Sequence, residues 1–199
     1  KAARSQWDIP EDCPLLLYVG RLAQEKNVEL VLDSFSQISQ RYSDARLLVV
    51  GGGPHLDALR RYAAALPASE RIIFAGPMAH SELTPVYAAA DLFVFASTTE
   101  TQGLVMAEAR AAGTPCVVAR GGGASETVRH GEDGIVVEPS REAFAAAISE
   151  LLDNPARLAA MREACHVNAT NHTPEAMTDA VLEVYRSVLS SDTLVTEEK

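Results

Sequence analysis

The 199-residue sequence has few cysteines, a deficit of basic residues and no long hydrophobic run. No apolar stretch approaches the ~20 residues that a membrane-spanning helix needs, so we expect none. Its three cysteines lack the spacing of a metal site and are expected to be reduced thiols of a cytoplasmic protein. Basic residues number 17 against 27 acidic ones, and the formal net charge of -10 argues against broad nucleic-acid binding.

Short apolar runs alternate with amphipathic segments along the first two thirds of the chain. The runs occupy residues 15–20, 46–54, 71–76, 91–97, 116–119 and 134–138. Such runs, joined by amphipathic helices, are typical of parallel strands buried on both faces. The sequence therefore predicts an α/β fold, a Rossmann-like doubly wound parallel sheet of about six strands, with helices only from residue 141 onward.

Four segments are expected along the chain. Residues 1–8 are interpreted as the remnant of an interdomain linker, and residues 9–172 as the Rossmann-like domain. Residues 173–190 are expected to form a C-terminal helix, and the polar residues 191–199 a disordered tail. Asn154-Pro155 and Thr173-Pro174 each have the pattern of an N-cap followed by proline at the first helical position.

Four loops are candidates for a ligand site. In a doubly wound sheet, ligands bind beyond the carboxyl ends of the strands, where loops lead into helix N-termini. That rule selects residues 19–27 (VGRLAQEKN), 50–55 (VGGGPH), 74–80 (FAGPMAH) and 96–104 (ASTTETQGL).

Two glycine runs, at residues 51–53 and 121–123, do not form a nucleotide fingerprint. In the G-x-G-x-x-G pattern the third glycine is replaced by Leu56 after the first run and by Glu126 after the second. Neither run is followed by the Gly-Lys-Ser/Thr of a P-loop. Tight turns that need positive φ are a sufficient explanation for the first run.

Arg21 and Lys26 flank a turn directly after a predicted strand. Two cations at the ligand edge of an acidic protein suit an anion such as a diphosphate. The alternative is a solvated pair in which Lys26 is bonded to Glu25 or Glu29, and charge alone does not decide between the two interpretations.

Glu100 and Glu108 lie on either side of a predicted helix start, with Gly103 between them. Gly103 would let the backbone approach a ligand, and the helix beginning near Leu104 would present unpaired N–H groups. Because a carboxylate accepts bonds from vicinal hydroxyls, one glutamate would hold a ribose and the other a hexose. The alternative is an exposed loop acid and a solvated helix residue.

The motifs together resemble a known family. GRLAQEKN, VVGGGP, FAGPM, ADLFVFASTTETQGLVMAEARAAGTPCVVA and GGGASETVRHGEDGIVVEP occur here in the order and spacing of the family 4 retaining glycosyltransferases. More narrowly, they are similar to the C-terminal, nucleotide-sugar-binding domain of the GT-B fold. The resemblance covers residues 9 to 140 closely and the helical remainder loosely.

The resemblance implies a role for each residue that binds the nucleotide. Arg21 and Lys26 would contact the donor diphosphate, and the backbone around Met78 would border the nucleobase. Glu108 would bind the ribose hydroxyls, with Val105 nearby.

The resemblance also implies how the transferred sugar is held. Glu100, the expected catalytic residue, would hydrogen-bond the sugar, and backbone N–H groups of Gln102, Gly103 and Leu104 would place sugar and phosphate. Gln102 stands where many members carry an aromatic residue. The Thr-Glu-Thr-Gln-Gly version at residues 99–103 resembles enzymes that glucosylate diacylglycerol.

By this resemblance the chain is part of a hexosyltransferase that moves a hexose from a UDP-glucose- or GDP-mannose-type donor to a lipid or saccharide acceptor. No cofactor besides the donor and no metal are expected, since Arg21 and Lys26 would supply the charge and no Asp-x-Asp motif occurs. An N-terminal GT-B domain would be its partner, and that domain would carry any contact with the inner face of the membrane. Without that domain the chain is expected to be inactive.

Two other classes of function are compatible with the sequence. One is another enzyme on the same fold, such as a nucleotide-sugar epimerase or a phosphorylase. A phosphorylase would need a lysine for pyridoxal phosphate, and Lys26 is the only lysine between residues 2 and 198. The other class is a non-catalytic module that binds a sugar nucleotide or a protein partner.

Overall fold

The six apolar runs form the six strands of one parallel sheet in a computed structural model, which describes residues 2–169 and 174–192. The strands are β1 Leu15–Val19, β2 Arg46–Val50, β3 Ile72–Gly76, β4 Leu92–Phe95, β5 Cys116–Ala119 and β6 Gly134–Val137. Their order in the sheet is β3-β2-β1-β4-β5-β6, and each neighbouring pair is parallel. The predicted Rossmann-like doubly wound fold is confirmed.

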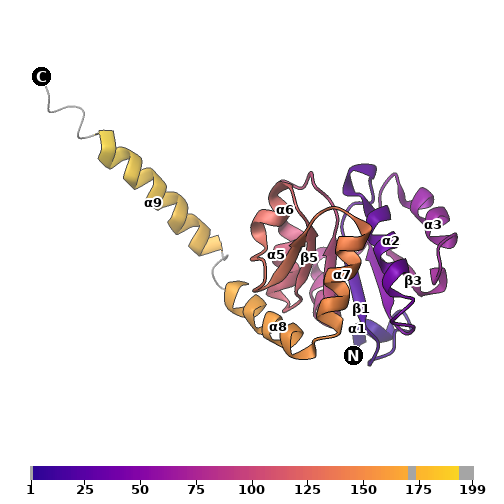
Figure 1. Cartoon of the computed structure of the whole chain (residues 1–199). Helices are drawn as coiled ribbons and strands as arrows, with labels where there is room; N and C mark the ends of the chain where they lie inside the picture. The colour runs from indigo at the N-terminus through magenta and orange to yellow at the C-terminus, as the bar shows by residue number, and fades with distance from the viewer. Residues whose placement is uncertain (1, 170–173, 193–199) are drawn as a thin grey trace, which may run out of the picture.

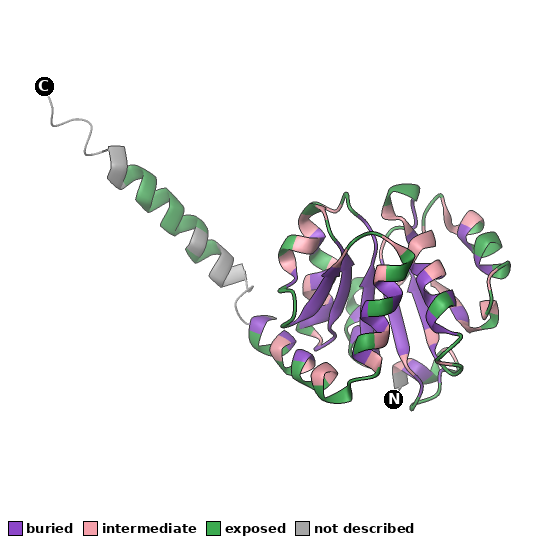
Figure 2. Ribbon diagram, in the orientation of Figure 1, coloured by how far each residue is buried: buried purple, intermediate pink, exposed green. Residues whose placement is uncertain are grey.

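Helices cover both faces of the sheet, which explains why the strands lack an alternating pattern. All five residues of β1 are buried, as are all four of β4 and β5 (Figure 2). From β1 the chain moves along the sheet toward β3, and from β4 it moves the opposite way toward β6. Since crossovers between parallel strands are right-handed, the helices of these two halves lie on opposite faces of the sheet. The helices are α2 Val28–Ile38, α3 Leu56–Ala64, α4 His80–Ala89, α5 Leu104–Ala111, α6 Gly122–Thr127, α7 Arg141–Leu152 and α8 Pro155–Ala169.

The helix contacts agree with this two-sided arrangement. On one face α2 packs against α7 (Figure 1), and on the other α5 packs against α4 and α8. Burial of apolar side chains between these layers is worth roughly 25 cal/mol per Å², so the sheet and its two helix layers supply most of the stability of the domain.

The strand order reverses between β1 and β4. These neighbours pair in register as Leu16 with Leu92 and Leu17 with Phe93. After β1 the chain continues toward β2, and after β4 it continues toward β5 on the other side. The two loops therefore diverge at the carboxyl end of the sheet. The space between them, called the crevice below, is the topological switch point where such folds bind ligands.

Stacked aromatic rings join β1 and β4, the two strands that meet at the switch point. The ring of Tyr18 stacks on that of Phe95 with centroids 5.7 Å apart, and Phe95 stacks on Phe93 at 6.1 Å. All three side chains are fully buried. The Tyr18 hydroxyl also donates a 3.3 Å hydrogen bond to the Arg21 carbonyl, which ties the first ligand loop to the core.

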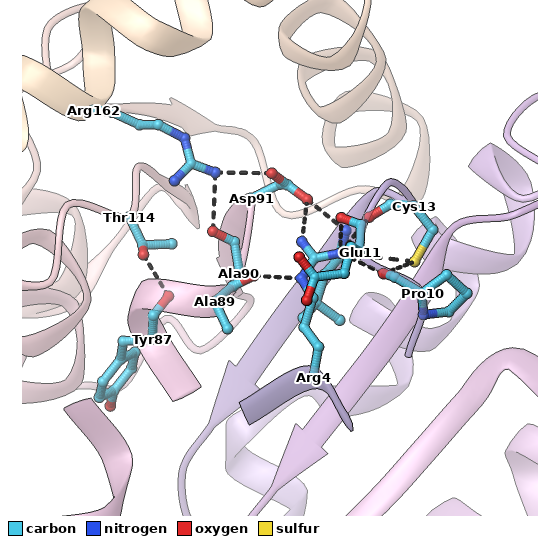
Figure 3. Close-up of polar contacts among 11 residues, drawn as sticks. Arg4, Pro10, Glu11, Cys13, Tyr87, Ala89, Ala90, Asp91, Thr114 and Arg162 are labelled. Carbon is cyan, nitrogen blue, oxygen red and sulfur yellow. Dashed lines mark hydrogen bonds and ion pairs between the residues drawn. The ribbon is translucent and has the colours of Figure 1, made fainter. Parts of the chain in front are cut away.

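Residues 1–8, predicted to be a linker remnant, are partly folded onto the domain. A short helix, α1 Ala2–Ser5, packs against α4. The Arg4 side chain is almost fully buried, and its guanidinium donates a 2.7 Å hydrogen bond to the Cys13 carbonyl. It also lies 2.9 Å from Asp91 Oδ2, while Arg162 of α8 binds the other Asp91 oxygen at 2.8 Å (Figure 3). The origin of this segment in a linker stays a prediction, but residues 2–5 are helical and not extended.

The two expected proline-led helix starts have different outcomes. Helix α8 begins at Pro155, and Asn154 Oδ1 accepts a 3.0 Å hydrogen bond from the Arg157 N–H, so the predicted N-cap is confirmed. Helix α9 spans Pro174–Asp192, two residues beyond the predicted end, and its expected cap, Thr173, lies outside the described residues. Residues 193–199 of the predicted tail lie outside them as well.

Helix α9 extends away from the α/β domain in Figure 1, and its described side chains are exposed in Figure 2. Within residues 2–169 and 174–192, none of the helices is both long and apolar enough to span a bilayer. All three cysteines are free and buried.

Candidate active site

Lys26 and Glu100 meet at the switch point although 74 residues separate them in the chain. Lys26 Nζ lies 2.9 Å from Glu100 Oε2, and the two side chains are only 19% and 20% exposed. Lys26 therefore does not pair with Glu25 or Glu29, the alternative that the sequence left open. Two of the predicted site residues are instead joined across the crevice.

The loop after β1 presents Lys26 through a tight local structure. A 3-10 turn spans Gln24–Lys26, and Asn27 closes it in the left-handed region with φ 50. Asparagine tolerates this conformation better than most residues because its short polar side chain can bond locally. Arg21, at the start of the same loop, is exposed and makes no ion pair among the described residues.

The Glu100 carboxylate is held in its ionised form. The hydrogen bond and charge of Lys26 lower its pKa, and the backbone N–H groups of Gln102 and Gly103 contribute by donating to Oε1 at 3.3 and 3.4 Å; partial desolvation opposes them. A carboxylate stabilised in this way is a fixed negative charge and hydrogen-bond acceptor.

Gly103 lets the loop enter α5. Its φ is +68, and a Cβ there would lie 2.8 Å from the Thr127 methyl group. Leu104, the first residue of α5, is 61% exposed, and Val105 is half-buried. The N–H groups of a helix's first turn have no partner inside the helix and carry its positive dipole end, so this edge attracts anions.

The second glycine run supports the Glu100 loop, a role that the sequence did not reveal. Gly123 N–H donates a 2.6 Å hydrogen bond to the Glu100 carbonyl. A Cβ on Gly122 would lie 2.6 Å from that same oxygen, and one on Gly123 would lie 2.1 Å from the Thr101 carbonyl. Only glycine lets α6 approach the loop this closely.

The first glycine run makes a tight turn, as predicted. Gly51 and Gly53 have φ of +141 and +156, and a Cβ on Gly51 would lie 1.9 Å from the Gly20 carbonyl. The turn walls a hollow of 210 Å³ at the ends of β1, β2 and β3, to which Arg21 and Met78 also contribute. Two more predicted residues are thereby brought to one place.

Glu108 lies one turn into α5 and contacts two residues of α4 that sequence reasoning missed. Its Oε2 accepts a 2.8 Å hydrogen bond from the Tyr87 hydroxyl, and its Oε1 lies 3.6 Å from His80 Nδ1. Tyr87 lies two turns after His80 on the same helix face, a spacing that becomes informative only once α4 is known to pack on α5.

The predicted positions fall into three groups among the described residues. Lys26 pairs with Glu100 beside the start of α5, Arg21 and Met78 line the hollow at the ends of β1 to β3, and Glu108 contacts α4. Cations, a helix N-terminus and acceptor carboxylates suit a ligand with an anionic part and several hydroxyls. Within the described residues, no group of three or more His, Cys, Asp or Glu could hold a metal ion.

Comparisons with known proteins agree with the fold and the motifs. D-inositol 3-phosphate glycosyltransferase from Rhodococcus opacus is 37% identical over 193 residues, which are 93% of this chain and 43% of that protein. The chain thus spans less than half the length of this curated relative.

Solved structures show the same architecture. Sucrose-phosphate synthase from Thermosynechococcus elongatus superposes with a TM-score of 0.79 at 30% identity, over 95% of this chain and 49% of that one. Anabaena Alr3699/HepE, solved in complex with UDP, gives a TM-score of 0.84 at 23% identity over 94% and 52% of the two chains, and so shares the fold. Residues 1–172 match the family model described as glycosyl transferases group 1, and the chain belongs to that family.

Proposed function

We propose that this chain is the donor-binding half of a retaining, metal-independent hexosyltransferase. Its donor would be a UDP-glucose- or GDP-mannose-type nucleotide sugar, and its acceptor a lipid or a saccharide. The observation that carries the proposal is the Lys26–Glu100 contact at the switch point, beside the N-terminus of α5. The UDP bound to Alr3699/HepE, which has the same fold, supports a nucleoside diphosphate as the ligand.

The diphosphate would lie between the cations and the helix N-terminus. Arg21 is exposed at the hollow that Met78 lines, so the nucleobase and the diphosphate can occupy neighbouring positions. Lys26 is fixed by Glu100 with its ammonium group in the crevice. Charge-assisted bonds from such groups to phosphate oxygens are short and strong.

The chemistry follows from where charge develops. Cleavage of the sugar–phosphate bond places positive charge on the sugar and negative charge on the leaving diphosphate. Arg21, Lys26 and the N–H groups at the start of α5 would stabilise the negative charge more in the transition state than in the ground state. The two cations would thereby take the part that a metal ion takes in other enzymes.

Glu100 would hold the sugar at the same time. Lys26 and the backbone N–H groups occupy part of its acceptor capacity, and a carboxylate has about four lone-pair positions, so it retains sites for sugar hydroxyls. Its negative charge would also favour the positive sugar that forms. Glu100 is proposed to position the donor, and no nucleophilic role is assigned to it.

Titration calorimetry with UDP, GDP and ADP in EDTA tests this proposal. We expect the folded chain to bind at least one of them without added metal, and the tightest of the three identifies the donor base. Failure of all three with folded protein would contradict the donor-site assignment.

A further inference from the structure

The buried phenol of Tyr87 forms a hydrogen bond with the carboxylate of Glu108. Tyr87 is 1% exposed, and its hydroxyl reaches Glu108 Oε2 at 2.8 Å across the contact between α4 and α5. The other oxygen, Oε1, faces His80 at 3.6 Å, and that imidazole is 81% exposed. One oxygen of the carboxylate is therefore anchored in the core, and the other lies on the solvent side.

Tyr87 is itself held rigidly. Its carbonyl oxygen accepts a 2.6 Å hydrogen bond from the Thr114 hydroxyl, which Figure 3 shows on the side away from the phenol. The carbonyl also accepts the Ala90 N–H at 3.0 Å, and the ring packs against Phe93 at 5.8 Å between centroids. Because its backbone carbonyl is hydrogen-bonded and its ring is packed, Tyr87 holds its hydroxyl at one position.

Tyr87 also remains a hydrogen-bond donor at any physiological pH. Burial and the bond to Glu108 both raise the pKa of its phenol. The hydroxyl proton is therefore always available to the carboxylate. A free glutamate side chain samples several rotamers, and a ligand that needs one of them loses affinity by ordering it.

We propose that Tyr87 is a positioning residue that orients Glu108 for vicinal hydroxyls, the ribose diol of the bound nucleotide. With Oε2 anchored, Oε1 and the free lone pairs of Oε2 are presented toward the crevice in a fixed direction. In a helix the Cα–Cβ bond tilts toward the N-terminus, so a residue one turn into α5 directs its carboxylate back toward the mouth. The inference rests on the function proposed above.

Tyr87→Phe removes the hydroxyl and keeps the ring, and two ligands separate positioning from packing. The ligands are the tightest of UDP, GDP and ADP and the 2′,3′-dideoxy form of the same nucleotide. We expect the variant to bind the natural nucleotide about three- to tenfold more weakly, the usual effect of one hydrogen bond, and to bind the dideoxy form almost as the wild type does. Because both ligands meet the same folded fraction, the ratio of their affinities is insensitive to a loss of stability.

Two variants of Glu108 complete the design. Glu108→Gln should lose the same preference for the diol, and adding Tyr87→Phe to it should cost nothing further. Glu108→Asp keeps the charge but is one methylene shorter, leaves the packing of Tyr87 intact and should also lose the preference.

Several outcomes would overturn the inference. An equal loss of affinity for both ligands in Tyr87→Phe would mean that the residue acts through the fold. An undiminished preference for the diol, in that variant or in Glu108→Asp, would mean that Glu108 needs no anchoring. If the wild type binds none of the three nucleotides, the proposed function fails as well. If binding and the Glu108→Gln effect stand while Tyr87→Phe changes nothing, only the inference about Tyr87 fails.

Discussion

Lys26 Nζ and Glu100 Oε2 lie 2.9 Å apart and bridge the two loops that diverge at the switch point. The pair joins the residue expected to contact phosphate to the residue expected to contact the sugar. Each partner limits the motion of the other, so the cation and the carboxylate would both be pre-arranged for the donor proposed above. Substitutions at Lys26 and Glu100 can therefore test the proposed function directly.

The cations should matter for phosphate and not for the nucleoside. Replacing Lys26 or Arg21 by Ala should weaken the diphosphate roughly ten- to a hundredfold per residue, since a charge-assisted hydrogen bond is worth about 1.5–3 kcal/mol. Affinity for the free nucleoside should stay unchanged in parallel calorimetric titrations. Arg41→Ala is a matched control, because Arg41 is a 64% exposed cation that pairs with Asp153 on α7's side of the sheet. Equal losses for nucleoside and diphosphate would instead mean that the cations act through folding.

The stability that Glu100 contributes should depend on pH. Its pKa is lowered in the folded protein, so its contribution is present above the ordinary glutamate pKa of about 4.3 and is lost as the pH falls through the lowered value. We expect Glu100→Gln to lower the free energy of unfolding by about 0–1 kcal/mol at pH 7, in line with partly exposed ion pairs. The difference between wild type and variant should shrink in urea titrations at pH 3. A difference that grows toward acid would contradict the assigned direction of the shift.

Gly103 should tolerate no side chain. Gly103→Ala would impose a left-handed backbone on alanine, at about 1–2 kcal/mol, and add a contact with Thr127 Cγ2 at 2.8 Å. Gly131→Ala is the matched control, because φ there is +87 and nothing lies within 4 Å of the added Cβ. We expect Gly103→Ala to reduce the free energy of unfolding more than Gly131→Ala does. Equal effects in the two variants would show that the loop gives way to the new methyl group.

Much of the fold could be predicted from the sequence, because buried parallel strands leave unbroken apolar runs and the helix starts carry local signals. The pairing of Lys26 with Glu100 could not, because it depends on β1 and β4 being neighbours, and strand order is a property of long-range packing. For the same reason Gly123 was not recognised as the partner of the Glu100 carbonyl.

The support of Glu108 was missed for a related reason. Tyr87 lies in an apolar stretch of α4 where a tyrosine is an ordinary core residue, and its hydroxyl gains a role only when α4 packs beside α5. The folded state of Arg4 was missed because the five residues that accept its hydrogen bonds come from two separate parts of the chain; they are Pro10, Glu11 and Cys13 in one part and Ala89 and Asp91 in the other.

The 199-residue chain should bind donor without transferring sugar. One α/β sheet is present in the described residues, and the proposed transfer would need a second domain to exclude water and align the acceptor. We expect no acceptor-dependent release of nucleotide when the chain is incubated with its tightest nucleotide sugar and a mixture of lipid and sugar acceptors. Release that requires an acceptor and disappears in Glu100→Ala would show that the chain is a complete enzyme.

A crystal structure of the chain with its tightest nucleoside diphosphate would test the central claim most directly. We predict a phosphate oxygen within about 3 Å of Lys26 Nζ and the nucleobase in the hollow beside Met78. A larger hollow of 480 Å³, lined by Asp33 and Arg141 where α2 and α7 meet, provides the rival position. Nucleotide bound there, with the crevice at Lys26 and Glu100 empty, would contradict the assignment of the donor site.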